Sequence, residues 1–424
     1  MFDGWARRSR TIGNTFAASR ERTGQVTREP MRTKPRRVRR WLLVTAGVLA
    51  LPLAAFLGVY VWASTSTDES TFARALVWRE SDVGDQERFP ARRIPAAGRA
   101  SLLPAGVEDD LVVSGERKGL DEFLGETKTL AFVVVHRDRL VHERYFDGAT
   151  RESLQTSFSA AKSFVSALVG IAIDAGLIES VDDRVTDYVP ELAKRDPRFR
   201  EITLRDLLTM SSGLRYREGG FPSLGDDTYT YYGVDLRDVA LNRTKIEQSP
   251  GLAWLYNNYN PLLLGLVLER TAGISVSDFM ARRLWQPLGA EADATWSLDS
   301  ESSGFEKMES GVNARPVDYA RFGLLFLHKG EWNSRRIISE GWVRESTGAD
   351  PATDPASYHG YRYFWWIDVE RPGRFYALGK YGQYIYVAPD ADAVVVRFGR
   401  DSGVGNNTWL ATFRDIADQL ERRS

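Results

Sequence analysis

A serine and a lysine with helical spacing could form the catalytic pair of a hydrolase. Ser159 precedes Lys162 by three residues, at the start of a run from 160 to 175 that is apolar on nearly every side. Such a run is typical of a buried helix, and Gly176 can end it in the left-handed conformation. Residues three apart share one face of a helix, so the hydroxyl and the amine should be neighbours.

The expected burial of Lys162 would give this pair its chemistry. No carboxylate stands three or four residues away in the sequence, so no local ion pair offsets the cost of burying an ammonium. Burial therefore favours the neutral amine. Ser159 would lie in the first turn, where free backbone N–H groups and the helix dipole favour an oxyanion. A hydroxyl beside a neutral amine is a nucleophile beside its base.

Two further motifs strengthen a spacing that is weak evidence alone. With 31 serines and nine lysines, the chain is expected to contain S-x-x-K about 0.7 times by chance. Tyr256-Asn257-Asn258 follows roughly a hundred residues later, and Lys380-Tyr381-Gly382-Gln383 leads directly into an apolar strand at 384–387. Their order along the chain makes the three motifs together far more specific than any one of them.

Each of these residues also has a structural explanation. Tyr256 could be an ordinary core tyrosine, and Asn258 could cap a helix that begins near Tyr259. Lys380 could be a solvated lysine at the end of a strand. The histidines at 136 and 142 face alternate sides of an expected hairpin, so we interpret them as structural.

The order of expected elements is strands, a helical block, strands and a final helix. Alternation and turn residues predict strands at 130–136, 140–146, 361–367, 375–378, 384–387 and 393–398. Apolar periodicity predicts helices at 203–210, 261–269, 317–328 and 409–420, and a loop over a site at 215–235. This order favours an α+β fold in which an antiparallel sheet is flanked by helices and a helical subdomain is inserted between its N- and C-terminal strands.

S-x-x-K, then Y-x-N, then K-x-G before a strand is the ordered signature of penicillin-recognising serine hydrolases. On these motifs the chain resembles the serine β-lactamase and penicillin-binding-protein superfamily, in its class C β-lactamase-like branch. That branch includes D-alanyl-peptidases, esterases and 6-aminohexanoate-dimer hydrolases. The resemblance covers residues 105–424 and is supported by the stretches 208–214 and 318–323. Residues 380–389 are most similar to the amide-hydrolase and esterase members.

The resemblance implies an acyl-enzyme mechanism. Ser159 would attack a carbonyl, Lys162 would accept its proton, and Tyr256 would protonate the leaving group and later activate water. Asn258 would hold Lys162 and the substrate amide. The backbone N–H groups of Ser159 and Gln383 would form the oxyanion hole.

Lys380 and Gly382 complete the implied substrate-binding residues. Neither a metal nor a cofactor is implied, and no H-E-x-x-H motif occurs among the four scattered histidines.

Two departures from the family pattern bear on the substrate. The second motif is Y-x-N rather than S-D-N, and no ω-loop glutamate motif is present, which favours deacylation assisted by tyrosine. Tyr381 stands where β-lactamases carry a threonine that helps to seat a substrate carboxylate. This difference argues against β-lactamase or D-alanyl carboxypeptidase activity, which we keep as alternatives.

The sequence therefore predicts hydrolysis of a small-molecule amide or ester. The alternative from another class is a penicillin-binding or sensor-type protein that keeps the pocket without turnover. A Ser-His-Asp α/β-hydrolase is disfavoured because G-x-S-x-G is absent. Trp365, Trp366 and the tyrosines between 216 and 232 suggest a pocket with apolar walls, although core packing explains such residues as often.

Charge and hydropathy divide the N-terminal part. Residues 1–40 carry twelve Arg or Lys against three acidic residues, and residues 41–63 carry no charge. As a helix, residues 41–63 would span roughly 34 Å, enough for a bilayer core. The basic flank would keep the N-terminus in the cytoplasm and place the domain outside it. A cleaved export signal ending near Ala63 is the alternative.

The resulting organisation is a basic cytoplasmic tail (1–40), a transmembrane helix (41–63), a linker (64–104) and a hydrolase domain (105–424). Beyond residue 63 the chain is acidic, which argues against a nucleic-acid partner. The absence of cysteine excludes disulfides. The sequence does not indicate an oligomeric state.

Overall fold

The computed structural model describes residues 35–98, 102–106, 111–113, 119–219, 225–348 and 360–422. The chain divides into two compact units, Met1–Gly58 and Val59–Ser424. Most of the predicted basic tail and parts of the predicted linker (99–101) and loop (220–224) lie outside the described residues.

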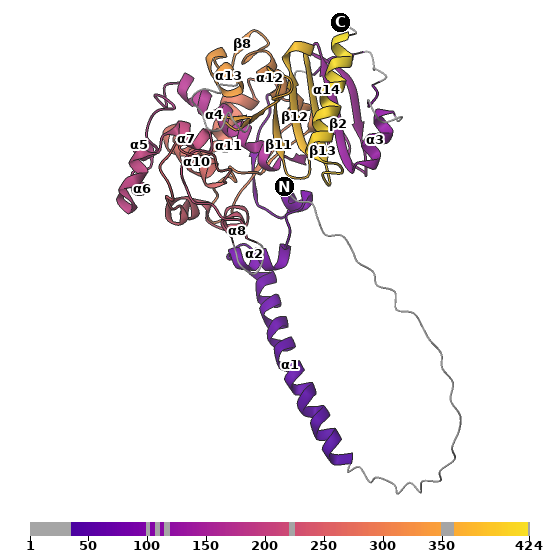
Figure 1. The fold of residues 1–424 in the computed structure, drawn as a ribbon, viewed down its shortest axis with the longest axis vertical. Coiled ribbons are helices and arrows are strands. Elements are labelled where there is room, and N and C mark those ends of the chain that lie inside the picture. The colour runs from indigo at the N-terminus through magenta and orange to yellow at the C-terminus, as the bar shows by residue number, and fades with distance from the viewer. Residues whose placement is uncertain are drawn as a thin grey trace, which may run out of the picture. The chain divides into compact units, whose positions relative to one another are not determined.

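The expected membrane span at 41–63 falls within a single helix, α1 (Pro35–Thr65), which contains Pro52 (Figure 1). Among the helices of the described ranges, none is both long enough and apolar enough to cross a bilayer. The transmembrane helix predicted at 41–63 is therefore not supported.

A seven-stranded antiparallel sheet forms the centre of the second unit, in the order β3-β2-β13-β12-β11-β10-β9 (Figure 1). Its strands are β2 (Thr129–His136), β3 (Arg139–Tyr145), β9 (Tyr361–Arg362), β10 (Trp365–Ile367), β11 (Phe375–Gly379), β12 (Gln383–Ala388) and β13 (Ala393–Gly399). Because β2 pairs with β13, the first and last strands of the domain lie side by side. The antiparallel α+β fold expected from the sequence is confirmed.

Each face of this sheet packs against helices, and alternate residues of one strand serve the two faces. Val133 lies in the core cluster that includes α4 (Ala161–Asp174) and α12 (Pro316–Leu327), whereas its neighbour Phe132 lies in the other cluster. That second cluster includes α14 (Asn406–Arg422) and α3 (Leu120–Glu126), which cover the outer face in Figure 1.

The helical subdomain lies between β3 and β9 in sequence. Its helices are α5 (Val185–Tyr188), α6 (Pro190–Arg195), α7 (Leu204–Leu208), α8 (Asp226–Tyr232), α9 (Leu236–Asp238), α10 (Tyr259–Ala272) and α11 (Val276–Met280). Of these, α10 packs against α4 and α7, so the subdomain shares a core with the helix that carries Lys162. Helix α13 (Glu340–Thr347) contacts β10.

Residues 64–104 differ from the linker expected there. They contain α2 (Thr71–Trp78), the 3-10 turn η1 (Val83–Glu87) and strand β1 (Ala91–Ile94). In a second sheet of order β1-β5-β6-β4, β1 pairs with β5 (Ala294–Ser297). The other two strands of this sheet are β4 (Gln155–Thr156) and β6 (Val312–Ala314). The segment therefore belongs to the compact unit. The sequence did not indicate this because the partners of β1 are about 200 residues away and produce no local periodicity.

The strand expected at 361–367 is wrong in its middle. Tyr363 and Phe364 have φ values of 40° and 66°, so β9 and β10 are separated by a two-residue turn and form a hairpin. Turns with positive φ are usually recognised by glycine or asparagine. The two aromatic residues at this turn gave no such signal, so the sequence did not predict it.

Candidate active site

The nucleophile candidate lies on a short turn held by the second sheet. Ser159 belongs to a 3-10 turn, η2 (Phe158–Ala160), that directly precedes α4, whereas the sequence suggested the first turn of the helix itself. The backbone N–H of Ser157 donates to Val312 O at 2.8 Å. Phe158 and Ala160 are buried and Ser159 is half-buried, so its hydroxyl is presented from a fixed turn.

Lys162 brings the predicted catalytic residues together. Its side chain is 1% exposed, and Nζ donates to Ser159 Oγ at 3.0 Å and to Glu309 O at 2.9 Å. The same nitrogen lies 5.0 Å from the ring centroid of Tyr256. The amine is therefore held between a hydroxyl, a carbonyl and an aromatic face.

A second buried lysine, Lys307, pairs with the side chain of Glu309, the residue whose backbone carbonyl accepts a hydrogen bond from Lys162. Lys307 Nζ and Glu309 Oε1 are 2.7 Å apart, and both side chains are nearly inaccessible. Burial lowers the pKa of Lys307, and the Glu309 carboxylate opposes this shift. Ser310 Oγ also donates to Glu309 at 2.9 Å. Sequence reasoning missed this pair, and nothing in the local sequence marks it.

The loop before α10 carries Tyr256 and is fixed by a turn at Met210. Leu255 N donates to Met210 O at 2.8 Å, and Asn257 N lies 3.5 Å from Met210 Sδ. Met210 itself has a φ of 59°. The stretch 208–214, noted above only as a family likeness, thus positions the tyrosine loop.

Aromatic rings surround Tyr256. The ring of Trp366 stacks on it at 6.2 Å and 23°, and Tyr361 approaches edge-on at 6.0 Å. Burial raises the pKa of Tyr361 well above its usual value, so that hydroxyl stays protonated. Of the tryptophan pair, Trp365 is fully buried in the core, and only Trp366 is partly exposed beside Tyr256.

Asn258 connects this loop to the subdomain. Its amide donates to Tyr216 Oη at 2.9 Å and lies 3.2 Å from Thr230 Oγ1. It makes no side-chain cap on α10, and Asn257 Oδ1 instead accepts from Asn260 N at 3.1 Å. The structure therefore places Asn258 against Tyr216 and Thr230, while Lys162 bonds to other groups.

The turn between β11 and β12 contains the third motif. Gly379 pairs with Gln383, and the turn residues Tyr381 and Gly382 have φ values of 65° and 72°. A Cβ at position 379 would lie 2.1 Å from Ser157 O, so the close approach of β11 to the nucleophile turn requires glycine. Both β11 and β12 contact η2, which brings the start of β12 at Gln383 close to the nucleophile turn.

A buried arginine holds this turn from behind. Arg397 is 0% exposed and donates through Nη1 to the carbonyls of Gly382 at 2.7 Å and Tyr381 at 3.1 Å. Its other nitrogens bond to Thr127 O and Thr129 Oγ1. Burial lowers the pKa of Arg397 to about 9. The sequence did not indicate this role, because an arginine within an apolar strand is normally expected to face solvent.

Lys380 faces the N-terminal segment of the domain. Its Nζ donates to Ser81 Oγ at 2.7 Å, and Tyr381 Oη donates to Ser81 O. Glu80 Oε2 lies 3.9 Å from the same ammonium.

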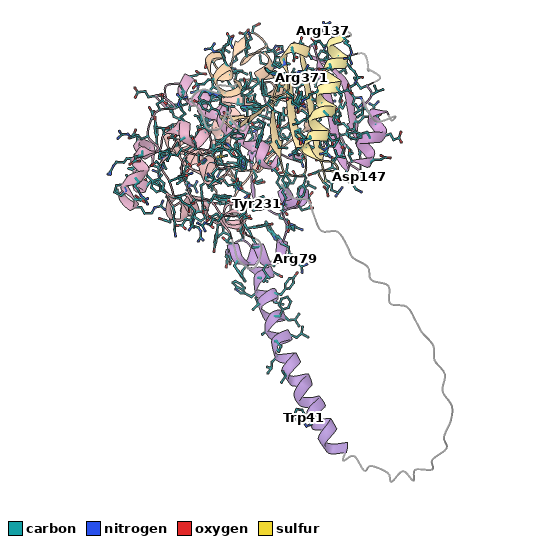
Figure 2. The ribbon with its side chains drawn as sticks, viewed as in Figure 1. Trp41, Arg79, Arg137, Asp147, Tyr231 and Arg371 are labelled. Carbon is teal, nitrogen blue, oxygen red and sulfur yellow. The ribbon has the colours of Figure 1, made fainter. Side chains whose placement is uncertain are left out.

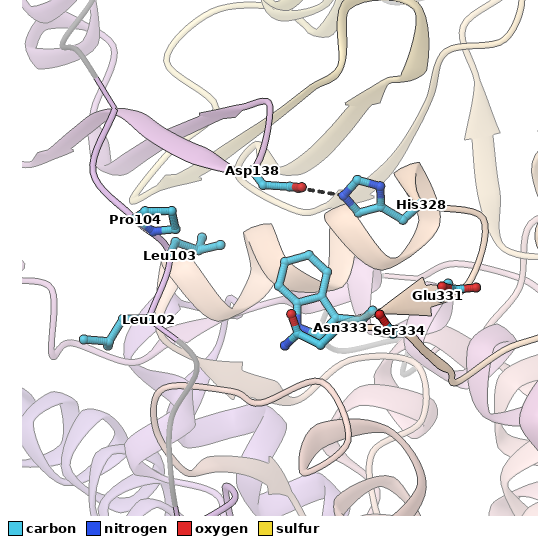
Figure 3. Close-up of a pocket in the computed structure, with 9 residues that line it drawn as sticks. Leu102, Leu103, Pro104, Asp138, His328, Glu331, Asn333 and Ser334 are labelled. Atoms are coloured by element: carbon cyan, nitrogen blue, oxygen red, sulfur yellow. Dashed lines mark hydrogen bonds and ion pairs between the residues drawn. The ribbon is translucent and has the colours of Figure 1, made fainter.

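A separate surface hollow of about 610 Å³ contains a histidine–aspartate pair (Figure 3). His328 Nε2 lies 2.6 Å from Asp138 Oδ1, and Leu103 and Trp332 line the same hollow. None of the predicted site residues lines it. Within the described ranges, no group of three or more His, Asp or Glu side chains could hold a metal ion.

The arrangement of a buried lysine, a turn-borne serine and a tyrosine agrees with comparisons to known proteins. The sequence profile of the β-lactamase family matches residues 119–406. The chain belongs to the β-lactamase family. This confirms the superfamily expected from the three motifs.

Its relatives include hydrolases and penicillin-binding proteins. A 6-aminohexanoate-dimer hydrolase of Paenarthrobacter ureafaciens is 28% identical over 66% of this chain and 74% of its own length. Penicillin-binding protein 4 of Amycolatopsis lactamdurans is 25% identical over 79% of this chain and 89% of its own. A solved Bacillus anthracis structure, described as a candidate 6-aminohexanoate-dimer hydrolase, is 27% identical with a TM-score of 0.73 and covers 82% of this chain and 95% of its own.

The Arg397 contacts predict a large effect of a conservative change. In Arg397→Lys a single ammonium cannot reach carbonyls on both sides, so buried acceptors lose their donors. We expect a loss of about 2–4 kcal/mol in the free energy of unfolding, together with reduced turnover. Urea unfolding measures the first. Arg400→Lys, at an exposed site 3.8 Å from Asp147, is the matched control and should change stability by less than about 0.5 kcal/mol. Equal effects of the two variants would contradict the role assigned to Arg397.

Proposed function

We propose that the protein is a serine hydrolase that cleaves an amide or ester bond through an acyl-enzyme on Ser159. The observation that carries this proposal is the buried Lys162 amine, 3.0 Å from Ser159 Oγ and 1% exposed. An amine in that position is a general base for the hydroxyl if it is neutral. The family match and the related hydrolases support the reaction class.

In the acylation step Ser159 Oγ attacks the substrate carbonyl, and its proton passes to Lys162. A neutral amine has one lone pair for that proton, while one of its own hydrogens bonds to Glu309 O at 2.9 Å. The tetrahedral oxyanion would be met by the backbone N–H groups of Ser159 and Gln383. Such a donor is worth roughly 3–4 kcal/mol of transition-state stabilisation.

Tyr256 would move protons on the leaving-group side. Lys162 Nζ lies over the face of the Tyr256 ring, 5.0 Å from the ring centroid, so the two residues share one site. In the proposed relay the proton taken by the lysine passes through the phenol hydroxyl to the leaving nitrogen or oxygen. In deacylation the relay runs in reverse: as water attacks the acyl carbon, its proton passes to the Tyr256 oxygen while the phenol proton moves to Lys162. The bond between the acyl carbon and Ser159 Oγ then breaks, Lys162 returns the proton to Oγ, and the carboxylic acid leaves. Trp366, stacked on Tyr256, would provide an apolar wall for the substrate.

The substrate class is a small amide or ester. The relative named as a 6-aminohexanoate-dimer hydrolase favours linear amides. The similarity to a penicillin-binding protein favours, as a second candidate, a protein that becomes acylated and does not turn over. The two differ in whether product continues to form after one equivalent has been released.

Ser159→Ala should remove turnover of a p-nitrophenyl ester by at least about a thousand-fold, because the nucleophile is lost. Labelling by a fluorophosphonate should disappear in the same variant. The control is Ser163→Ala, one turn further along α4, where Oγ donates a hydrogen bond to Phe364 O at 2.7 Å. Retained turnover in Ser159→Ala would show that the nucleophile is wrongly assigned, and a single burst without turnover in the unmodified protein would favour the second candidate.

Tyr256→Phe should lower kcat by roughly a hundred- to ten-thousand-fold while KM changes little, since only a proton-transfer group is removed. Saturation kinetics with an amide substrate measure both constants. The control is Tyr361→Phe, whose hydroxyl stays protonated and whose ring lies 6.0 Å from that of Tyr256. Similar losses in both variants would show that Tyr256 acts only through packing.

The location of the domain stays a prediction of the sequence. The basic residues 1–40 and the uncharged residues 41–63 predict a domain outside the cytoplasm, or secretion after cleavage near Ala63. Protease added to intact spheroplasts of an expressing bacterium should digest the domain, or the domain should be found in the medium. Protection of the domain alongside a cytoplasmic control protein would contradict the prediction.

A further inference from the structure

Residues 79–89, here called the strap, join α2 to β1 and contact two tyrosines, Tyr381 and Tyr231, that both pack against Phe158 of η2. Arg79, its first residue, and Tyr231 of α8 lie on the same side of the domain in Figure 2. The hydroxyl of Tyr232 donates to Arg79 O at 2.8 Å, which fixes the start of the strap.

On one side the strap binds the third motif. Ser81 accepts two hydrogen bonds, from Lys380 Nζ to its Oγ at 2.7 Å and from Tyr381 Oη to its carbonyl. The ring of Tyr381 in turn contacts Phe158 edge-on, with centroids 5.4 Å apart. A continuous chain of contacts therefore leads from Ser81 through Tyr381 to Phe158, the residue that directly precedes Ser159.

On the other side the strap binds α8. Asp85 accepts a hydrogen bond from Tyr231 Oη at 2.9 Å, and Phe89 packs edge-on against the same ring at 5.7 Å. Tyr231 then stacks on Phe158 at 6.4 Å and 19°. Both paths from the strap therefore end on Phe158, the residue that precedes Ser159.

The strap also changes the electrostatic surroundings of Lys380. Its ammonium is the cation of the third motif, and the strap supplies both a hydroxyl acceptor and the carboxylate of Glu80 at 3.9 Å. Tyr381 also donates a hydrogen bond to the strap. A carboxylate that approached this half-exposed ammonium would compete with Ser81 Oγ for its N–H donors and would meet the negative charge of Glu80.

We propose that Glu80 and Ser81 occupy the cationic end of the active site, so that the enzyme selects acyl donors without a carboxylate on the leaving group. This inference rests on the proposed function and deepens it by naming the substrate class. Glu80 and Ser81 are specificity-determining residues, and the catalytic groups remain those at Ser159.

The test compares two esters that differ by one charge, phenyl acetate and 3-carboxyphenyl acetate, each corrected for its rate of alkaline hydrolysis. The unmodified full-length protein should favour phenyl acetate. In Ser81→Ala, which frees Lys380 and keeps the carbonyl that holds Tyr381, the ratio of kcat/KM values should shift toward the anionic ester by roughly 3- to 10-fold, mainly through KM. Glu80→Gln should shift it in the same direction, less at high salt.

Two controls separate specificity from stability. Glu87→Gln, an exposed charge on the same strap, should leave the ratio unchanged. In the double variant Ser81→Ala/Lys380→Ala the gain should vanish, since the freed ammonium is what would bind the carboxylate. An unchanged ratio in Ser81→Ala, a uniform fall for both esters, or a gain that survives loss of Lys380 would each overturn the proposal.

Fluorophosphonate labelling at Ser159 distinguishes failure of this inference from failure of the proposed function. Labelling with no change in the ester ratio would reject the strap as a selector and leave the hydrolase intact. Absence of labelling and of turnover would reject the hydrolase itself, and the strap proposal with it.

Discussion

The structure depends on one buried amine whose every near neighbour is fixed. Lys162 is inaccessible to water and is bounded by Ser159 Oγ, Glu309 O and the ring of Tyr256. Both hydrogen-bond acceptors of the amine are uncharged groups, one a side-chain hydroxyl and the other a backbone carbonyl. Two such contacts, together with the aromatic face, fix the direction in which Nζ points. The helix that carries it is buried over twelve consecutive residues, so the amine cannot swing into solvent.

Positioning the opposite wall of the site has its own steric requirement. Strand β11 can pass against Ser157 because Gly379 has no side chain, and the turn that follows adopts two successive left-handed residues. A strained turn persists only when its surroundings over-determine it. Here Arg397 bonds to two of its carbonyls from below, and Gln383 Nε2 bonds to Lys380 O at 3.0 Å. The geometry of this turn therefore depends on the buried guanidinium of Arg397.

The parts that could be predicted from the sequence are those that depend on local periodicity and on ordered motifs. The hairpin of β2 and β3 and the buried helix α4 follow from apolar patterns within a few residues. The parts that could not be predicted depend on contacts between distant segments. Ser81 meets Lys380 across 299 positions, and Lys162 meets Glu309 across 147. Neither contact leaves a pattern in the local sequence. For this reason residues 64–104, which include Ser81, were expected to be a linker.

Tyr381 shows how one residue can change the use of a motif without removing it. Its phenol hydroxyl donates a hydrogen bond to Ser81 O in the strap. Its ring meanwhile packs against Phe158, which has a φ of 43° and directly precedes the nucleophile. Tyr381 thus links the strap, the third motif and the turn that carries Ser159. A rigid wall is obtained at the expense of a binding group, which is consistent with a hydrolase whose specificity rests on shape and apolar contact rather than on a carboxylate.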